Sequence, residues 1–140
     1  MDFEFPREFE GFREELREFV RTELPDDWVD ADEAGPEKVK VIRKKLAQKG
    51  WLTLPWPKEY GGMGSPHLQQ IVFNEEMAYH RVPASDNAIS MLGPILMLEG
   101  TDEQKSTFLP PITQADVRWA QGYSEPGSGS DLASLQTSAV

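Results

Sequence analysis

The sequence predicts a mainly α-helical protein, in which a bundle of five helices is followed by one or two β-strands. Three observations predict this class. Apolar residues recur every three or four positions through most of the chain, which is the spacing of one helix face. Prolines, glycines and capping residues divide this part into segments of helical length. The apolar and aromatic run 117–123 then leads into a Gly/Ser-rich stretch, which indicates a strand followed by a loop.

Residues 7–23 are predicted to form the first helix, which Pro25 ends. Its apolar side chains repeat at helical spacing between arginines and glutamates, so that one face is apolar and the other is charged. We interpret the apolar stripe as core packing. It comprises Phe5, Phe9, Phe12, Leu16, Phe19 and Val20.

The acidic segment 26–37 is predicted to be an exposed connection, after which Pro36 starts a second helix over residues 37–49. Gly50 is expected to end that helix in a left-handed conformation. The following segment, 51–66, combines three prolines and three glycines with two tryptophans and two leucines. This composition forbids regular structure but favours burial, so we expect a loop that packs on the domain.

A third helix is predicted to begin with Ser65 as its N-cap and Pro66 in its first turn, and to run to about residue 81. A fourth helix, 87–99, is expected to be capped by Ser85 or Asp86. It is apolar nearly all round, which indicates either a central position in the bundle or contact with an apolar ligand.

A fifth helix is predicted to start at a capping box formed by Thr101 and Gln104, and to end before Pro110 and Pro111. Residues 135–140 alternate in polarity and could form a second strand. A sheet of one or two strands has unpaired edges. We therefore expect an N-terminal helical domain over residues 1–112 and the truncated start of a β domain over 113–140.

Composition limits the function. The 140 residues carry a net charge of −10, which argues against a nucleic-acid partner, and contain no cysteine for disulfides or thiol chemistry. The N-terminus shows no secretory signal, and the longest apolar run, 91–98, is too short to span a bilayer. A cytoplasmic protein without a membrane span is expected.

The candidate site is the stretch 119–132. Its run of Gly127, Ser128, Gly129 and Ser130 lets a backbone approach a ligand closely and offers N–H and O–H donors, which suit an anion. Asp131 is expected to cap a short helical turn after this run.

The common catalytic and nucleotide-binding motifs are absent. The Gly/Ser run lacks the third glycine of a dinucleotide fingerprint, and no Gly–Lys–Ser/Thr phosphate loop occurs. Residues 122–126 fail the nucleophile-elbow pattern at the last position. Glu76 and His80 are four residues apart and could share a metal, but nothing supplies a third ligand. We interpret this pair as part of a helix surface and expect no metal site.

Four motifs together resemble the acyl-CoA dehydrogenase family. Residues 123–131, YSEPGSGSD, are similar to its T/S-E-P-x-A/S-G-S/T-D loop, and residues 56–62, WPKEYGG, to its W-P-x-E-Y/F-G-G turn. Residues 73–76 resemble a helix that leads to the acyl site. Residues 100–110 resemble G-T/S-x-E-Q-K…Y/F-L-P. Residues 132–139 look like a bacterial branch that often acts on branched, aromatic or steroid side-chain acyl-CoA thioesters.

The resemblance implies an FAD enzyme that oxidises the Cα–Cβ bond of an acyl-CoA and passes electrons to an electron-transfer flavoprotein. It also implies homo- or hetero-oligomers with other acyl-CoA dehydrogenase subunits. No residue of this chain inherits the catalytic role, because the family's glutamate base lies in a C-terminal domain. The implied FAD-binding residues are Gln121, Gly122, Tyr123, Ser124, Gly129 and Ser130.

The implied substrate-binding residues are Ser130, between the FAD phosphates and the thioester, and Asn87 and Met91, in the acyl-chain wall. Core packing alone remains an alternative for that wall. Glu125 and Asp131 are expected to hold the shape of the loop. Two alternatives for the function stay open: an acyl-CoA oxidase or flavin monooxygenase on the same scaffold, and a non-catalytic helical partner subunit. The chain alone is expected to be inactive and to bind FAD weakly.

Overall fold

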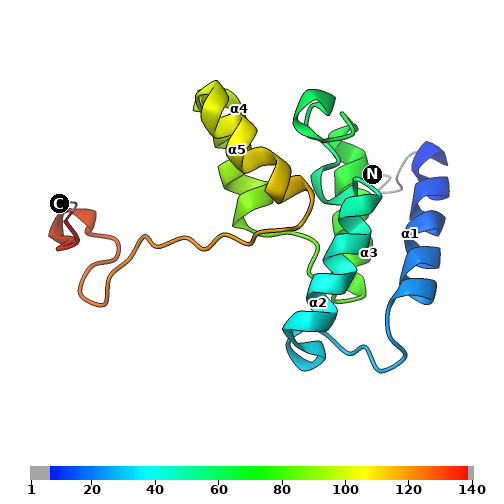
Figure 1. The fold of residues 1–140 in the computed structure, drawn as a ribbon. Helices are drawn as coiled ribbons and strands as arrows, with labels where there is room; N and C mark the ends of the chain where they lie inside the picture. Colours follow the sequence, from blue (N-terminus) through cyan, green and yellow to red (C-terminus); the bar gives the residue numbers. More distant parts are fainter. Residues whose placement is uncertain (1–6, 139–140) are drawn as a thin grey trace, which may run out of the picture.

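The computed structural model describes residues 7–138, and within them the chain is mainly helical, as predicted. In Figure 1, α1, α2 and α3 form one group, and α4 and α5 lie together beside it. Helix α1 packs on α3, and α4 packs on α5. The described α-helices are α1 (Glu10–Glu23), α2 (Ala31–Gln48), α3 (His67–Tyr79), α4 (Gly93–Glu99) and α5 (Asp102–Thr113).

The apolar stripe of α1 packs in the core, which confirms the prediction for its described residues; Phe5 lies outside them. Leu16 and Phe19 are 0% and 4% exposed. The rings of Phe12 and Phe19 meet the ring of Trp51 edge to face, with centroids 5.7 and 5.5 Å apart. Trp51 belongs to the segment 51–66, whose tryptophans and leucines are all buried, so the prediction that this loop packs on the domain is also confirmed.

Helix α2 begins earlier than predicted. The side chain of Asp30 accepts hydrogen bonds from the N–H groups of Asp32 and Glu33, and so caps a first helical turn inside the segment expected to be an exposed connection. Gly35, with φ of 80°, then breaks the helix, and Pro36 restarts it. Gly50 ends α2 with φ of 71°, as predicted.

The predicted cap of α3 is wrong. Pro66 occupies the N-cap position, and no side chain bonds to the first turn. Ser65 donates its backbone N–H to the carbonyl of Leu54 at 2.9 Å, because it belongs to the packed loop and not to the helix.

The fourth predicted helix consists of a π-helical turn, η4 (Ala88–Leu92), followed by α4. Asp86, not Ser85, caps it. Pro94 lacks an N–H donor, and in a regular α-helix its ring would meet a carbonyl one turn earlier. The wider π turn lies directly before it and gives the ring more room. The helix is not central in the bundle, because Ile95 and Leu98 are 55% and 79% exposed.

Helix α5 continues through Pro110 and Pro111 to Thr113, so its predicted end is wrong. The carbonyls one turn earlier belong to exposed residues, where water can replace the missing proline donors. Leu109 and Ile112 are 2% and 1% exposed, and their burial holds the last turn on the core. The predicted capping box is present at the start of the helix.

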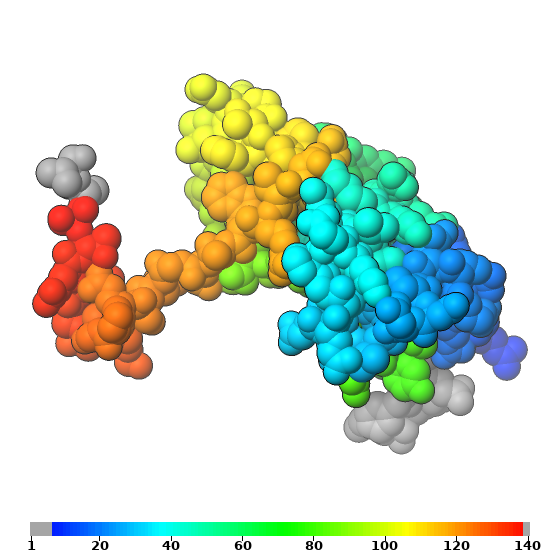
Figure 2. Space-filling model, turned by 60° about the horizontal axis from the view of Figure 1, so that its bottom comes forward, coloured from blue at the N-terminus to red at the C-terminus, as the bar shows by residue number. Residues whose placement is uncertain are grey.

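After α5 the chain leaves the helical body and forms an extended segment, residues 117–138, which we call the arm (Figures 1 and 2). An ion pair between Lys44 and Asp116 and an edge-to-face contact between Phe108 and Trp119 hold its start. The predicted strand 117–123 is absent, because the described chain has no strand beside it to complete a ladder. Residues 135–138 form no strand either, and 139–140 lie outside the described residues.

Candidate functional site

The Gly/Ser-rich stretch of the arm folds back on itself as a tight turn. Glu125 and Ser128 exchange two backbone hydrogen bonds, at 2.9 and 3.0 Å. The hydroxyl of Ser128 donates to the carbonyl of Asp131 at 2.7 Å, and Ser128 is only 5% exposed. The turn therefore keeps a defined shape although this end of the arm stands clear of the helices.

Glu125 holds this shape, as predicted. Its carboxylate accepts the N–H groups of Gln136 and Thr137, at 3.0 and 2.8 Å, and the hydroxyl of Thr137. The hydroxyl of Thr137 and these N–H groups lower the pKa of Glu125 below its ordinary value. Asp131 makes no side-chain cap, contrary to the prediction. Its backbone carbonyl instead accepts hydrogen bonds from the hydroxyls of Ser128 and Ser134.

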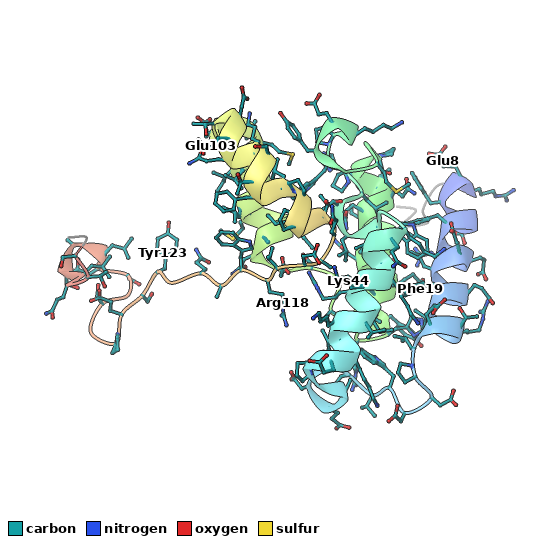
Figure 3. All side chains as sticks on the ribbon, viewed as in Figure 1. Glu8, Phe19, Lys44, Glu103, Arg118 and Tyr123 are labelled. Carbon is teal, nitrogen blue, oxygen red and sulfur yellow. The ribbon has the colours of Figure 1, made fainter. Side chains whose placement is uncertain are left out.

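The six predicted FAD-binding residues all lie on the arm, and all are exposed. Tyr123 is 62% exposed, and its side chain stands out from the arm (Figure 3). A side chain built at Gly122 or Gly129 would meet nothing within 4 Å, so the backbone there is open to a ligand. The donor set consists of exposed backbone N–H groups and the hydroxyls of Ser124 and Ser130. It fits the phosphates and the polar ring edge of FAD.

The predicted acyl-wall residues lie elsewhere. Asn87 directly precedes η4, and Met91 lies in it; both are exposed on the helical body, Met91 by 44%. The end of the arm that carries the Gly/Ser-rich turn lies apart from the helical body in Figures 1 and 2, so the structure does not bring these residues together with Ser130.

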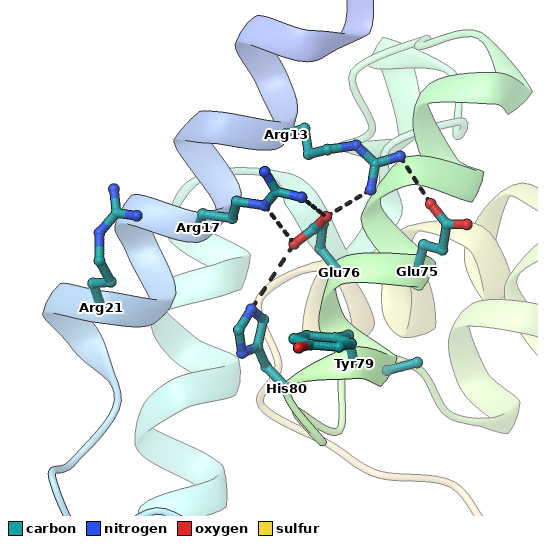
Figure 4. A pocket seen from close by; sticks show the side chains of 8 residues that line it. Arg13, Arg17, Arg21, Glu75, Glu76, Tyr79 and His80 are labelled. Carbon is teal, nitrogen blue, oxygen red and sulfur yellow. Dashed lines mark hydrogen bonds and ion pairs between the residues drawn. The ribbon is translucent and has the colours of Figure 1, made fainter. Parts of the chain in front are cut away.

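The sequence interpretation missed a buried ionic cluster between α1 and α3. Glu76 is 4% exposed, so its assignment to a helix surface was wrong. One carboxylate oxygen of Glu76 accepts hydrogen bonds from Nη1 of Arg13 at 2.6 Å and from Nη2 of Arg17 at 3.1 Å. The other oxygen accepts a hydrogen bond from Nε of Arg17 at 3.2 Å (Figure 4). Glu76 follows Val72 and Phe73 at helical spacing, and this spacing is the sequence signal that indicates the buried face of the helix.

The cluster borders a groove of about 730 Å³, which Arg13, Arg17, Arg21, Glu75, Glu76, Ala78, Tyr79 and His80 line. Burial alone would raise the pKa of Glu76, but hydrogen bonds from Arg17 and Arg13 outweigh burial and lower it. The guanidinium groups beside Glu76 are already engaged by carboxylates. The cluster therefore serves to hold α1 on α3.

Replacing Glu76 with glutamine should lower the free energy of unfolding at pH 7 by about 2 kcal/mol, because charge-assisted hydrogen bonds are lost from a buried site. Because its pKa is lowered on folding, Glu76 stabilises the fold above its unfolded pKa, and this contribution disappears as the pH falls through the folded pKa. Urea unfolding from pH 7 down to pH 3 measures both effects.

The matched control is Glu10→Gln, which removes the same charge from an exposed position at the start of α1. It should change the stability at pH 7 by less than about 0.5 kcal/mol. An equal loss in both variants, or a Glu76→Gln protein that loses stability in acid as steeply as the wild type, would contradict the proposed role of the cluster.

Two other features are absent from residues 7–138. No group of three His, Asp or Glu side chains could hold a metal ion there. His80 and Glu76 approach each other only to 3.9 Å, and Glu76 is occupied by the arginines. No helix in this range combines the length and the apolar character needed to cross a membrane.

The fold and the site thus define a protein with a helical domain that is followed by an arm rich in hydrogen-bond donors. The family model for the acyl-CoA dehydrogenase N-terminal domain matches residues 6–116. The chain is also 48% identical over 103 residues to acyl-CoA dehydrogenase FadE26 of Mycobacterium tuberculosis. This alignment covers 71% of the present chain and 26% of FadE26. The chain belongs to the acyl-CoA dehydrogenase family.

Solved structures agree over nearly the whole chain. The ChsE4-ChsE5 complex of Mycobacterium tuberculosis matches with a TM-score of 0.84 and 37% identity, over 98% of this chain and 35% of that one. The Tcur3481-Tcur3483 steroid ACAD matches with a TM-score of 0.80 and 39% identity, over 98% and 36%. The chain therefore spans about a third of the length of these relatives.

Proposed function

We propose that the full-length protein is an FAD-dependent acyl-CoA dehydrogenase, which oxidises the Cα–Cβ bond of an acyl-CoA thioester. The observation that carries this proposal is the family match over residues 6–116, followed directly by the donor-rich turn of the arm. We propose that residues 1–112 form the helical domain, and that residues 113–140 open a β domain. No residue of this chain is assigned the role of base.

The arm would contribute one side of the cofactor site. Bound FAD would supply the acceptor for the hydride that leaves the β-carbon. Gln121, Gly122, Tyr123 and Ser124 would border its ring. The N–H of Gly129 and the hydroxyl of Ser130 would donate to its phosphates, and Ser130 would also reach the thioester. Glu125 would orient these donors, because its bonds to residues 136–137 fix the turn.

Replacing Ser124 or Ser130 with alanine should weaken FAD binding by the full-length protein about 10-fold each, since each change removes one hydrogen bond worth about 1.4 kcal/mol. Fluorescence titration of the apoprotein with FAD measures this change. The matched control is Ser106→Ala, whose hydroxyl bonds to the carbonyl of Glu103 on α5. Unchanged affinity in both arm variants would contradict the proposed contacts of the two hydroxyls with FAD.

The relatives support a proposal for the substrate and the partners. Similarity to a protein described as a steroid ACAD supports an acyl-CoA with a steroid side chain. Similarity to the two-protein complexes ChsE4-ChsE5 and Tcur3481-Tcur3483 supports a hetero-oligomer with a second subunit of the family. We propose an electron-transfer flavoprotein as the acceptor.

The choice of acceptor separates the proposal from its alternatives. The acyl-CoA-reduced enzyme should be reoxidised rapidly by an electron-transfer flavoprotein and slowly by O2, as stopped-flow absorbance would show. Fast reoxidation by O2 would instead identify an oxidase or a monooxygenase. A second candidate, a partner subunit without catalysis, is favoured by the heteromeric relatives. It would form a stable complex with a cognate subunit but would hold no FAD of its own.

A further inference from the structure

A buried carboxylate lies at the start of the π turn η4. The side chain of Asp86 is only 8% exposed, and both of its oxygens are engaged. Oδ1 accepts the N–H groups of Ala88 and Ile89 at 3.0 and 3.1 Å, and Oδ2 accepts Nη2 of Arg43 at 2.6 Å. One carboxylate therefore both starts the turn and ties it to α2.

Arg43 fixes the position of this carboxylate from α2. Its side chain is 4% exposed, and its second nitrogen, Nη1, donates to the carbonyl of Pro83 at 2.8 Å. The planar guanidinium thus holds the segment before η4 at two points and leaves little freedom of rotation. Loss of either partner would leave the other charge buried without compensation.

The start of the turn determines which residues face outward. Ala88 and Ile89 are 1% and 9% exposed and pack in the core, whereas Asn87 and Met91 are exposed. Neighbouring helical residues point about 100° apart. If the helix began one residue earlier or later, residues other than Asn87 and Met91 would therefore be exposed at this place. Single π turns inside helices often occur at functional sites.

The other end of the turn is fixed by Trp56. A Cβ atom at Gly93 would lie 2.1 Å from two atoms of the Trp56 ring, so that ring packs directly against the backbone where η4 meets α4. Trp56 is 4% exposed and belongs to the packed loop. Contacts with Asp86 at one end and Trp56 at the other therefore fix the register of η4.

We propose that Asp86, held by Arg43, is a positioning residue for the substrate: it sets the start of η4 and thereby places Asn87 and Met91 in the acyl-chain wall. This inference rests on the proposed function and on the acyl-chain wall that the resemblance to the family implies for Asn87 and Met91. It adds two buried residues that do not themselves line that wall. Bulky acyl groups depend on this placement most, because a short chain makes few contacts with the wall.

The test compares the full-length, FAD-loaded protein with its Asp86→Ala variant, using butyryl-CoA and a steroid side-chain acyl-CoA. Asp86→Ala should raise KM for the steroid substrate about 10-fold or more, because small displacements of positioning groups are costly. The KM for butyryl-CoA and the kcat values should change less than about 3-fold. Asp86→Asn keeps an acceptor for both N–H groups and should restore part of the loss. If Asp86→Ala does not fold, the comparison uses Asp86→Asn.

The matched control is Asp27→Ala, which removes the ion pair with Lys38, equally short at 2.6 Å but exposed. Equal KM values in the Asp86 and Asp27 variants would overturn the inference while the wild type remains an active dehydrogenase. Hydrogen exchange gives a readout that does not depend on activity: the amides of Ala88 and Ile89 should exchange faster in Asp86→Ala, and unchanged exchange would also overturn it. A wild type that oxidises neither acyl-CoA overturns the proposed function and, with it, this inference.

Discussion

Replacing Phe73 with alanine is expected to lower the free energy of unfolding by about 3–5 kcal/mol. Phe73 is 1% exposed and is the largest of the fully buried side chains in the described part of the chain. It lies on α3, which packs against α1, so its removal opens a cavity that rigid neighbours cannot close. A loss of this size is a large fraction of the stability of an ordinary domain, about 5–15 kcal/mol.

Urea unfolding followed by circular dichroism measures this loss. Ile71→Ala is the matched control, because Ile71 lies two residues away on the same helix but is 48% exposed. It should cost less than about 1 kcal/mol. Similar losses in the two variants would show that α3 does not present the face to the core that the structure gives it.

Gly93→Ala is expected to destabilise the fold by about 3 kcal/mol, at the upper end of the cost of overpacking a core. The new methyl group would lie 2.1 Å from Cζ2 and Cη2 of Trp56 and 3.1 Å from the carbonyl oxygen of Ala88. The Trp56 ring is rigid and buried, so it cannot move aside without disturbing the loop around it. A drop in the thermal unfolding midpoint measures the effect.

The same substitution at Gly11 should have the opposite sign. Gly11 lies in α1, and a Cβ there would meet nothing within 4 Å. Alanine is the better helix former by up to about 1 kcal/mol, so Gly11→Ala should stabilise the protein slightly. If Gly93→Ala were tolerated as well as Gly11→Ala, the close packing of Trp56 on η4 would be wrong.

Helices were predictable from the sequence wherever local signals and the core agree. The apolar stripe of α1 was predicted correctly because residue spacing alone decides which face of a helix is apolar. The capping box of α5 was predicted correctly because Thr101 and Gln104 form their hydrogen bonds within one turn. The left-handed Gly50 is local in the same way. These features need no knowledge of distant residues.

The predictions that failed depend on distant partners. Ser65 does not cap α3, because it belongs to the packed loop and Pro66 takes the N-cap position. Pro110 does not end α5, because burial of the last turn outweighs the lost donors. The predicted strand 117–123 needs a partner strand, which the described chain does not provide. Glu76 joins an ionic cluster because Arg13 and Arg17, from a distant part of the sequence, meet it.

The candidate site divides in the same way. Its small residues and donors were visible in the sequence, but their association with FAD came from the resemblance to the family. The tie between Glu125 and residues 136–137 was predicted only as a shape-holding role, and the structure supplies its bonds. Asp86 was expected as a possible helix cap, but its pairing with Arg43 gave no signal, because the two residues lie far apart in sequence.

The absorbance spectrum of the purified full-length protein, recorded anaerobically before and after the addition of an acyl-CoA, tests the central claim most directly. The proposed function predicts a flavin band in the visible range that the protein retains through purification and that bleaches when the substrate is added. A full-length protein that is colourless and fails to take up added FAD, or whose flavin band no acyl-CoA bleaches, would contradict it.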